Sequence, residues 1–124
     1  MKEHQEMVAR LIKTGEQIWW TITPQNCDLI HMAMGISGEA GELLDAIKKR
    51  VIYNKPLDKE NVIEELGDLE FYMEGLRSAL KITREETLKA NIKKLSKRYK
   101  NFRYTDKLAI DQKDKKKNEN KNDS

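Results

Sequence analysis

Apolar residues recur at steps of three and four along most of this 124-residue chain, and this spacing constrains its fold more than any other feature. Such steps place side chains on one face of an α-helix, whereas a strand would alternate every second residue. The spacing is regular over 29–51, 62–80 and 88–102, and looser over 8–22. We therefore expect an all-α fold.

Proline and helix-capping residues separate these stretches. Pro24 suits the first position of a helix, and Asp58 suits the cap of the next one. Thr83 and Glu86 have the spacing of a capping box, in which each side chain bonds to the other residue's backbone. The sequence predicts helices over 3–20, 24–50, 58–81 and 83–102. Because the connections are short, we expect an antiparallel four-helix bundle.

The length allows one domain, and the composition changes towards the carboxyl end. Residues 111–124 contain no apolar side chain, and such a segment cannot offset the entropy cost of becoming ordered. We predict a helical catalytic domain over 1–105 and a charged, disordered tail over 106–124. The chain has no apolar run that could span a membrane, no signal peptide and a lone cysteine, Cys27, which together predict a cytoplasmic protein. A net charge of +3 is too small to indicate a nucleic acid partner.

Two acidic pairs on the second and third predicted helices indicate chemistry. Glu39 with Glu42, and Glu65 with Asp68, are each spaced i, i+3, so both carboxylates of a pair project from one side of their helix. Both pairs border the apolar stripe, and antiparallel packing would bring the four carboxylates together. Two like charges about 6 Å apart repel by about 3 kcal/mol at an effective dielectric constant of 20. Such a cluster raises pKa values or binds cations, and its oxygen ligands favour Mg²⁺ or Mn²⁺.

A glycine lies inside each acidic pair, Gly41 in the first and Gly67 in the second. Glycine within a helix costs up to about 1 kcal/mol relative to alanine. Close approach of another backbone or of a ligand would explain both glycines. The alternative for either pair alone is that it forms a solvated helix face.

Three sequence blocks carry a more specific signal. They are GISGEAGEL at 35–43, EELGDL at 64–69 and NIKKLSKRY at 91–99. Together they resemble the MazG-like members of the all-alpha nucleoside triphosphate pyrophosphatases, over about residues 25–104. The resemblance implies hydrolysis of a nucleoside triphosphate between its α and β phosphates, giving a monophosphate and pyrophosphate. It also implies that Mg²⁺ is coordinated by Glu39, Glu42, Glu65 and Asp68.

One of these carboxylates would accept a proton from the attacking water as the general base, and we favour Glu39 or Glu42. Some relatives carry a further glutamate directly before the first one, where this chain has Gly38. That departure leaves the number of metal ions and the identity of the base open. Glu64, directly before Glu65, is either an outer group of the site or a surface acid.

The last predicted helix offers cations for the phosphates. Asn91, Lys94 and Arg98 are spaced i, i+3, i+7 and share a side. Lys94 and Arg98 would hold the β and γ phosphates, and Asn91 would bind the sugar or a metal-bound water. The alternative is that these basic residues complement the helix dipole and the solvent.

Three further residues are candidates for contact with the base or sugar. Tyr72 follows Asp68 by one helical turn, and His31 lies on the same side as Glu42. The alternative for both Tyr72 and His31 is that they are ordinary core residues without a role in binding. Trp19 and Trp20 point to different sides of their helix, so one should be in the core and the other could stack on a base.

Two other functions stay open at this point. One is a non-enzymatic helical interaction module, whose acidic seam is structural and whose basic tail binds an acidic partner. The other is a related pyrophosphatase specific for dUTP or a phosphoribosyl nucleotide. Helices of this length bury only part of their apolar surface within one chain, so we expect a homodimer or homotetramer, and for the enzyme a nucleotide cleft near an interface.

Overall fold

The computed structural model describes residues 1–112 and 114–115, and all regular secondary structure within them is helical. The all-α prediction is therefore confirmed. The chain divides into two units, Met1–Leu80 and Lys81–Ser124. The four-helix bundle stays a prediction. No helix in the described part of the chain is long and apolar enough to cross a membrane.

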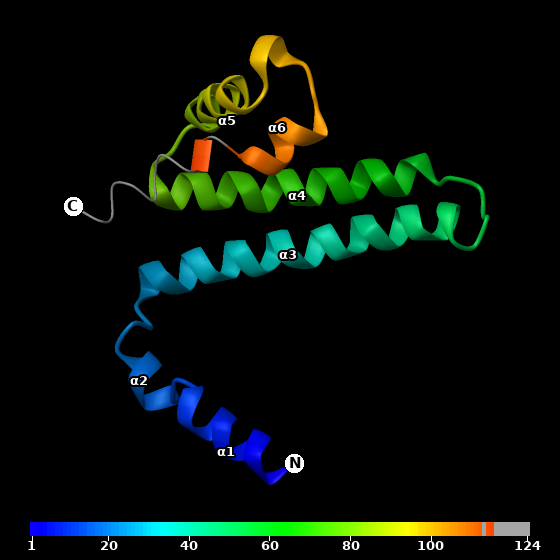
Figure 1. Ribbon diagram of the computed structural model, residues 1–124. Coiled ribbons are helices and arrows are strands. Elements are labelled where there is room, and N and C mark those ends of the chain that lie inside the picture. The colour runs from blue at the N-terminus through cyan, green and yellow to red at the C-terminus, as the bar shows by residue number, and fades with distance from the viewer. Residues whose placement is uncertain (113, 116–124) are drawn as a thin grey trace. The chain divides into compact units, whose positions relative to one another are not determined.

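Two long antiparallel helices, α3 (Pro24–Val51) and α4 (Lys59–Leu80), form a hairpin in the first unit (Figure 1). The Thr23 side chain caps α3 by accepting a hydrogen bond of 3.1 Å from the Asn26 backbone N–H. Asp58 accepts the equivalent bond of 3.1 Å from Asn61 at the start of α4. The predicted starts of both helices are thus confirmed by the capping contacts.

The predicted helix over 3–20 is wrong, because two shorter helices replace it: α1 (Lys2–Leu11) and α2 (Gly15–Trp19). Ile12 leaves the helical region, with φ −68° and ψ 140°. Thr14 then starts a new helix through a capping box with Gln17, at 3.3 Å and 2.9 Å for the two reciprocal bonds. The T-x-x-Q spacing of this box is visible in the sequence and marks the break.

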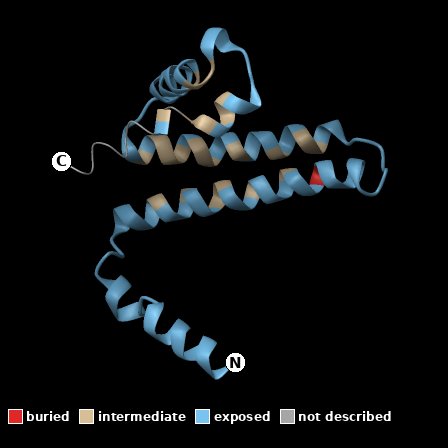
Figure 2. Cartoon of the chain, in the orientation of Figure 1, coloured by how far each residue is buried: buried red, intermediate tan, exposed pale blue. Residues whose placement is uncertain are grey.

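The packed face of the hairpin is narrow, and Figure 2 shows that most of both helices is exposed. Ala46, at 8% exposure, is the one buried residue in the described part of the chain. Half-buried apolar residues surround the contact: Leu29, Met32, Ile36 and Leu43 on α3, and Val62, Leu69, Met73 and Leu76 on α4.

The packed face of α3 is turned slightly from the predicted apolar stripe, which consists of Leu29, Ala33, Ile36, Ala40, Leu43, Ile47 and Val51. Ala40 and Ile47 are exposed, whereas Glu39 and Ala46, which precede them, are half-buried and buried. On α4, Glu65 is likewise half-buried beside an exposed Leu66. The rotation therefore moves two glutamates from the border of the packed face into it.

Two glycines allow the helices to approach closely. A side chain at Gly35 would collide with the ring of Tyr72, and one at Gly75 would collide with the sulfur of Met32. The glycines predicted to have this role behave differently, because a Cβ atom at Gly41 or Gly67 would meet no other group within 4 Å. The predicted close approach of protein backbone at those two positions is wrong for the described residues, while close approach of a ligand stays a prediction.

The second unit contains α5 (Arg84–Arg98), a 3-10 turn η1 (Lys100–Phe102) and α6 (Asp106–Asp111). Thr83 and Glu86 form the predicted capping box, with bonds of 3.1 Å and 2.6 Å. The predicted helix over 83–102 ends earlier, because Tyr99 is extended and Asn101 has a positive φ of 56°.

Helix α6 lies at the start of the segment predicted to be a disordered tail. Thr105 caps it by accepting a bond of 3.2 Å from Leu108, and Leu108 and Ala109 are half-buried. A part of the segment predicted to be a disordered tail is therefore helical in the structure, and it is the part that contains apolar residues. Residues 113 and 116–124 lie outside the described residues, and the prediction of disorder there stays a prediction.

Candidate metal centre

Acidic side chains of α3 and α4 meet across the hairpin. Glu39 on α3 and Glu65 and Asp68 on α4 each offer one carboxylate oxygen, and these atoms all lie within 4.8 Å of one another. Glu39 and Glu65 are half-buried, and Asp68 is exposed. The structure thus brings together three of the four residues predicted to bind a metal.

Helix geometry explains which acids meet. Antiparallel packing places Glu39 opposite Glu65, and the i, i+3 spacing puts Asp68 about one turn further along α4. The fourth predicted ligand, Glu42, is not a member of this close group. Its negative charge nevertheless acts on Glu65, so it lies near enough to belong to the electrostatic environment of the cluster.

The cluster makes one of its members hard to ionise. Partial desolvation raises the pKa of Glu65 above its ordinary value, with further contributions from hydrogen bonding to Glu39 and from the negative charges of Glu39, Glu42 and Asp68. A divalent cation would relieve this repulsion. The three groups are carboxylates, which are hard oxygen ligands and suit Mg²⁺ or Mn²⁺. The residues present therefore fit such an ion.

The aromatic candidates on the hairpin take part in helix packing. The Tyr72 ring lies over Gly35 and meets His31 edge-on, with 6.3 Å between ring centroids. The neighbouring Phe71 ring also meets the Tyr72 ring edge-on, with 5.1 Å between ring centroids. Tyr72 is half-buried, which agrees with the alternative that it is an ordinary core residue. His31 is exposed, which does not agree with that alternative.

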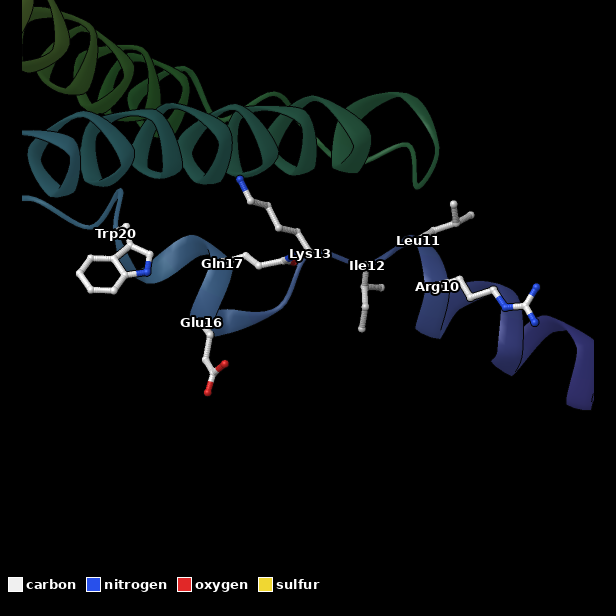
Figure 3. Close-up of a pocket in the computed structure, with 7 residues that line it drawn as sticks. All are labelled: Arg10, Leu11, Ile12, Lys13, Glu16, Gln17 and Trp20. Atoms are coloured by element: carbon white, nitrogen blue, oxygen red, sulfur yellow. The ribbon is translucent and has the colours of Figure 1, made fainter.

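The tryptophans of the first unit are both exposed, Trp19 by 66% and Trp20 by 83%. The expectation that one of them is in the core is therefore wrong, since α2 ends at Trp19 and neither ring is covered. A hollow beside Trp20 also contains Lys13 and Glu16. Figure 3 shows the side chains of these residues pointing in different directions, so this hollow does not gather functional groups around one point.

The basic residues of α5 are arranged around an acid that sequence reasoning missed. The Arg98 guanidinium donates two hydrogen bonds to Asp114, with Nε–Oδ1 at 3.0 Å and Nη2–Oδ2 at 3.2 Å. Lys94 lines a hollow together with Asp114, whereas Asn91 is exposed. The only sequence signal for the Arg98–Asp114 pair is opposite charge at a separation of 16 residues, which does not identify a partner.

The fold and the acidic cluster define an all-α protein with a carboxylate site suited to a divalent cation. The family model of the MazG nucleotide pyrophosphohydrolase domain matches residues 29–103, and the chain belongs to this family. The family resemblance seen in the sequence is thereby confirmed, and membership indicates a hydrolase that acts on nucleotides. Neither curated proteins nor solved structures give a significant match to the chain.

Proposed function

We propose that this protein is a Mg²⁺-dependent nucleoside triphosphate pyrophosphohydrolase. It would cleave a ribo- or deoxyribonucleoside triphosphate between the α and β phosphates, releasing the monophosphate and pyrophosphate. The observation that carries the proposal is the convergence of Glu39, Glu65 and Asp68 within 4.8 Å, inside the segment that matches the family model.

The cation belongs to this proposal because four negative carboxylates would otherwise repel a triphosphate. Glu39, Glu65 and Asp68 would hold Mg²⁺ or Mn²⁺, with Glu42 about one turn away on α3. Bound there, the ion would neutralise phosphate charge and lower the pKa of a water molecule.

The remaining chemistry comes from this chain's own side chains. Glu39 or Glu42 would accept the proton of the attacking water. Lys94 and Arg98 would hold phosphate oxygens, as basic side chains do with charge-assisted hydrogen bonds. Asn91 would contact the sugar or a water.

Three aromatic or imidazole groups are candidates for contact with the base. Among these three, Trp19 offers the largest ring, and 66% of the residue is exposed; His31 is also exposed. Tyr72 would reach the nucleotide only at its ring edge or hydroxyl, because its ring packs over Gly35. A panel of substrates would show whether the enzyme instead has a narrower specificity, for dUTP or for a phosphoribosyl nucleotide.

We also propose that the protein associates with itself as a homodimer or homotetramer. Ile30, Met34 and Leu44 on α3 are 58%, 66% and 68% exposed, and Ile63 and Phe71 on α4 are 68% and 66% exposed. A hairpin that buries so little apolar surface cannot offset its conformational entropy alone. A second copy would cover these faces, and sedimentation showing a stable monomer would contradict this part of the proposal.

The substitution Asp68→Asn tests the metal assignment. It removes a ligand charge but keeps the side-chain shape, and we expect Mg²⁺-dependent turnover to fall by orders of magnitude while the circular dichroism spectrum stays unchanged. Asp45→Asn is the matched control, because Asp45 lies on the same hairpin in an exposed ion pair with Lys49. Near-normal turnover of Asp68→Asn would remove the assignment, and the absence of turnover in the unsubstituted protein would favour a non-enzymatic interaction module.

A further inference from the structure

A two-bond ion pair joins Arg98, at the end of α5, to Asp114. Two roughly parallel hydrogen bonds of 3.0 Å and 3.2 Å connect the guanidinium to both carboxylate oxygens. The side chains are only 15% and 8% exposed, respectively, in a part of the chain where most residues are exposed. The guanidinium therefore has two of its donors satisfied by an acid of the same chain.

The surroundings of Asp114 are basic. The hollow that contains it is lined by Ala90, Lys93, Lys94, Lys97 and Lys115. The Arg98 hydrogen bonds hold the pKa of Asp114 below its ordinary value, with smaller contributions from the positive charges of Arg98 and Lys94. Asp114 is thus a single carboxylate surrounded by cationic side chains, as a bound anion would be in an anion-binding site.

Carboxylate and phosphate compete for the same donors, because both accept two parallel bonds from the planar guanidinium fork. We propose that Arg98 and the lysines of α5 form an anion site that Asp114 occupies, so that a polyphosphate must displace this carboxylate in order to bind. Asp114 then acts as an autoinhibitory group. The polyphosphate as the competing ligand rests on the function proposed above.

Titration of the full-length protein with inorganic triphosphate, without divalent metal, tests this directly. Asp114→Asn keeps the side-chain shape but removes the competing charge, and we expect its affinity for triphosphate to rise about fivefold, the upper range for an ion pair of this kind. Asp111→Asn is the matched control, because it removes one negative charge three residues earlier and leaves the Arg98–Asp114 contact in place. Equal affinities of the two variants would overturn the proposal, and so would weaker binding by Asp114→Asn, which would make Asp114 a positioning residue for Arg98.

The Arg98→Ala background separates displacement from a general charge effect. If Asp114 acts by occupying Arg98, the gain from Asp114→Asn disappears when Arg98 is absent. A gain that persists in that background would overturn the proposal. Circular dichroism of each variant verifies that the helix content is retained.

Turnover of a nucleoside triphosphate with Mg²⁺, measured on the same proteins, keeps this inference distinct from the proposed function. Hydrolysis by the unsubstituted protein without a binding gain in Asp114→Asn would reject the autoinhibitory contact alone. A binding gain without hydrolysis in any variant would support the contact and reject the pyrophosphohydrolase.

Discussion

Carboxylate oxygens of Glu39 and Glu65 lie within 4.8 Å of one another across the α3–α4 hairpin, and hydrogen bonding between the two side chains helps to raise the pKa of Glu65. A raised pKa means that the folded protein binds this proton more tightly than the unfolded chain does. Glu65 therefore costs stability as the pH rises from its ordinary pKa through the raised one.

The first prediction follows from that sign. Glu65→Gln should raise the melting temperature of the metal-free protein at pH 7, because the amide adds no charge to the cluster and can donate to Glu39. The gain should shrink as the pH falls towards 4.5, the ordinary value for this side chain, where Glu65 becomes protonated in the unsubstituted protein as well. Thermal unfolding across this pH range measures it, with Glu64→Gln on the exposed side of α4 as the control. A lower melting temperature for Glu65→Gln at pH 7 would contradict the prediction, because it would mean that the charge of Glu65 does not destabilise the fold.

The second prediction concerns the metal itself. Millimolar Mg²⁺ should raise the melting temperature of the unsubstituted protein, since a ligand that binds only the folded state stabilises it by mass action, by about 1.4 kcal/mol at ten times its Kd. The shift should be lost in Glu39→Gln, which removes one of the three converging carboxylates. A melting temperature that does not respond to Mg²⁺ or Mn²⁺ would favour a structural role for the cluster.

The third prediction separates two glycines of the same helix. Gly35→Ala should destabilise the protein by about 1–3 kcal/mol, because the added methyl group collides with the Tyr72 ring between the helices. Gly38→Ala meets nothing within 4 Å and should stabilise α3 by up to about 1 kcal/mol through helix propensity alone. Chemical denaturation measures both, and equal effects would mean that α3 and α4 do not approach at Gly35.

The helical fold could be predicted from the sequence because local signals agree. Thr23, Asp58 and Thr83 each cap a helix where the capping rules place it. The helix predicted over 3–20 is interrupted because the Thr14–Gln17 capping box starts a new helix inside it.

Contacts between distant segments were harder to predict. Periodicity identifies an apolar stripe but does not fix which edge of it packs, and the packed face of α3 includes Gly35, Glu39 and Ala46. The acidic pairs were still found, because their i, i+3 spacing places them beside that face under either rotation. The Arg98–Asp114 pair could not be found, since a charged segment offers many equivalent partners to an arginine.

The most direct test of the central claim is the identity of the products. The protein, Mg²⁺ and a panel of ribo- and deoxyribonucleoside triphosphates would be followed by ³¹P nuclear magnetic resonance. We predict equal amounts of nucleoside monophosphate and pyrophosphate from at least one substrate, with no turnover when the divalent cation is removed. Release of orthophosphate with nucleoside diphosphate, or cleavage that continues without a divalent cation, would contradict the account.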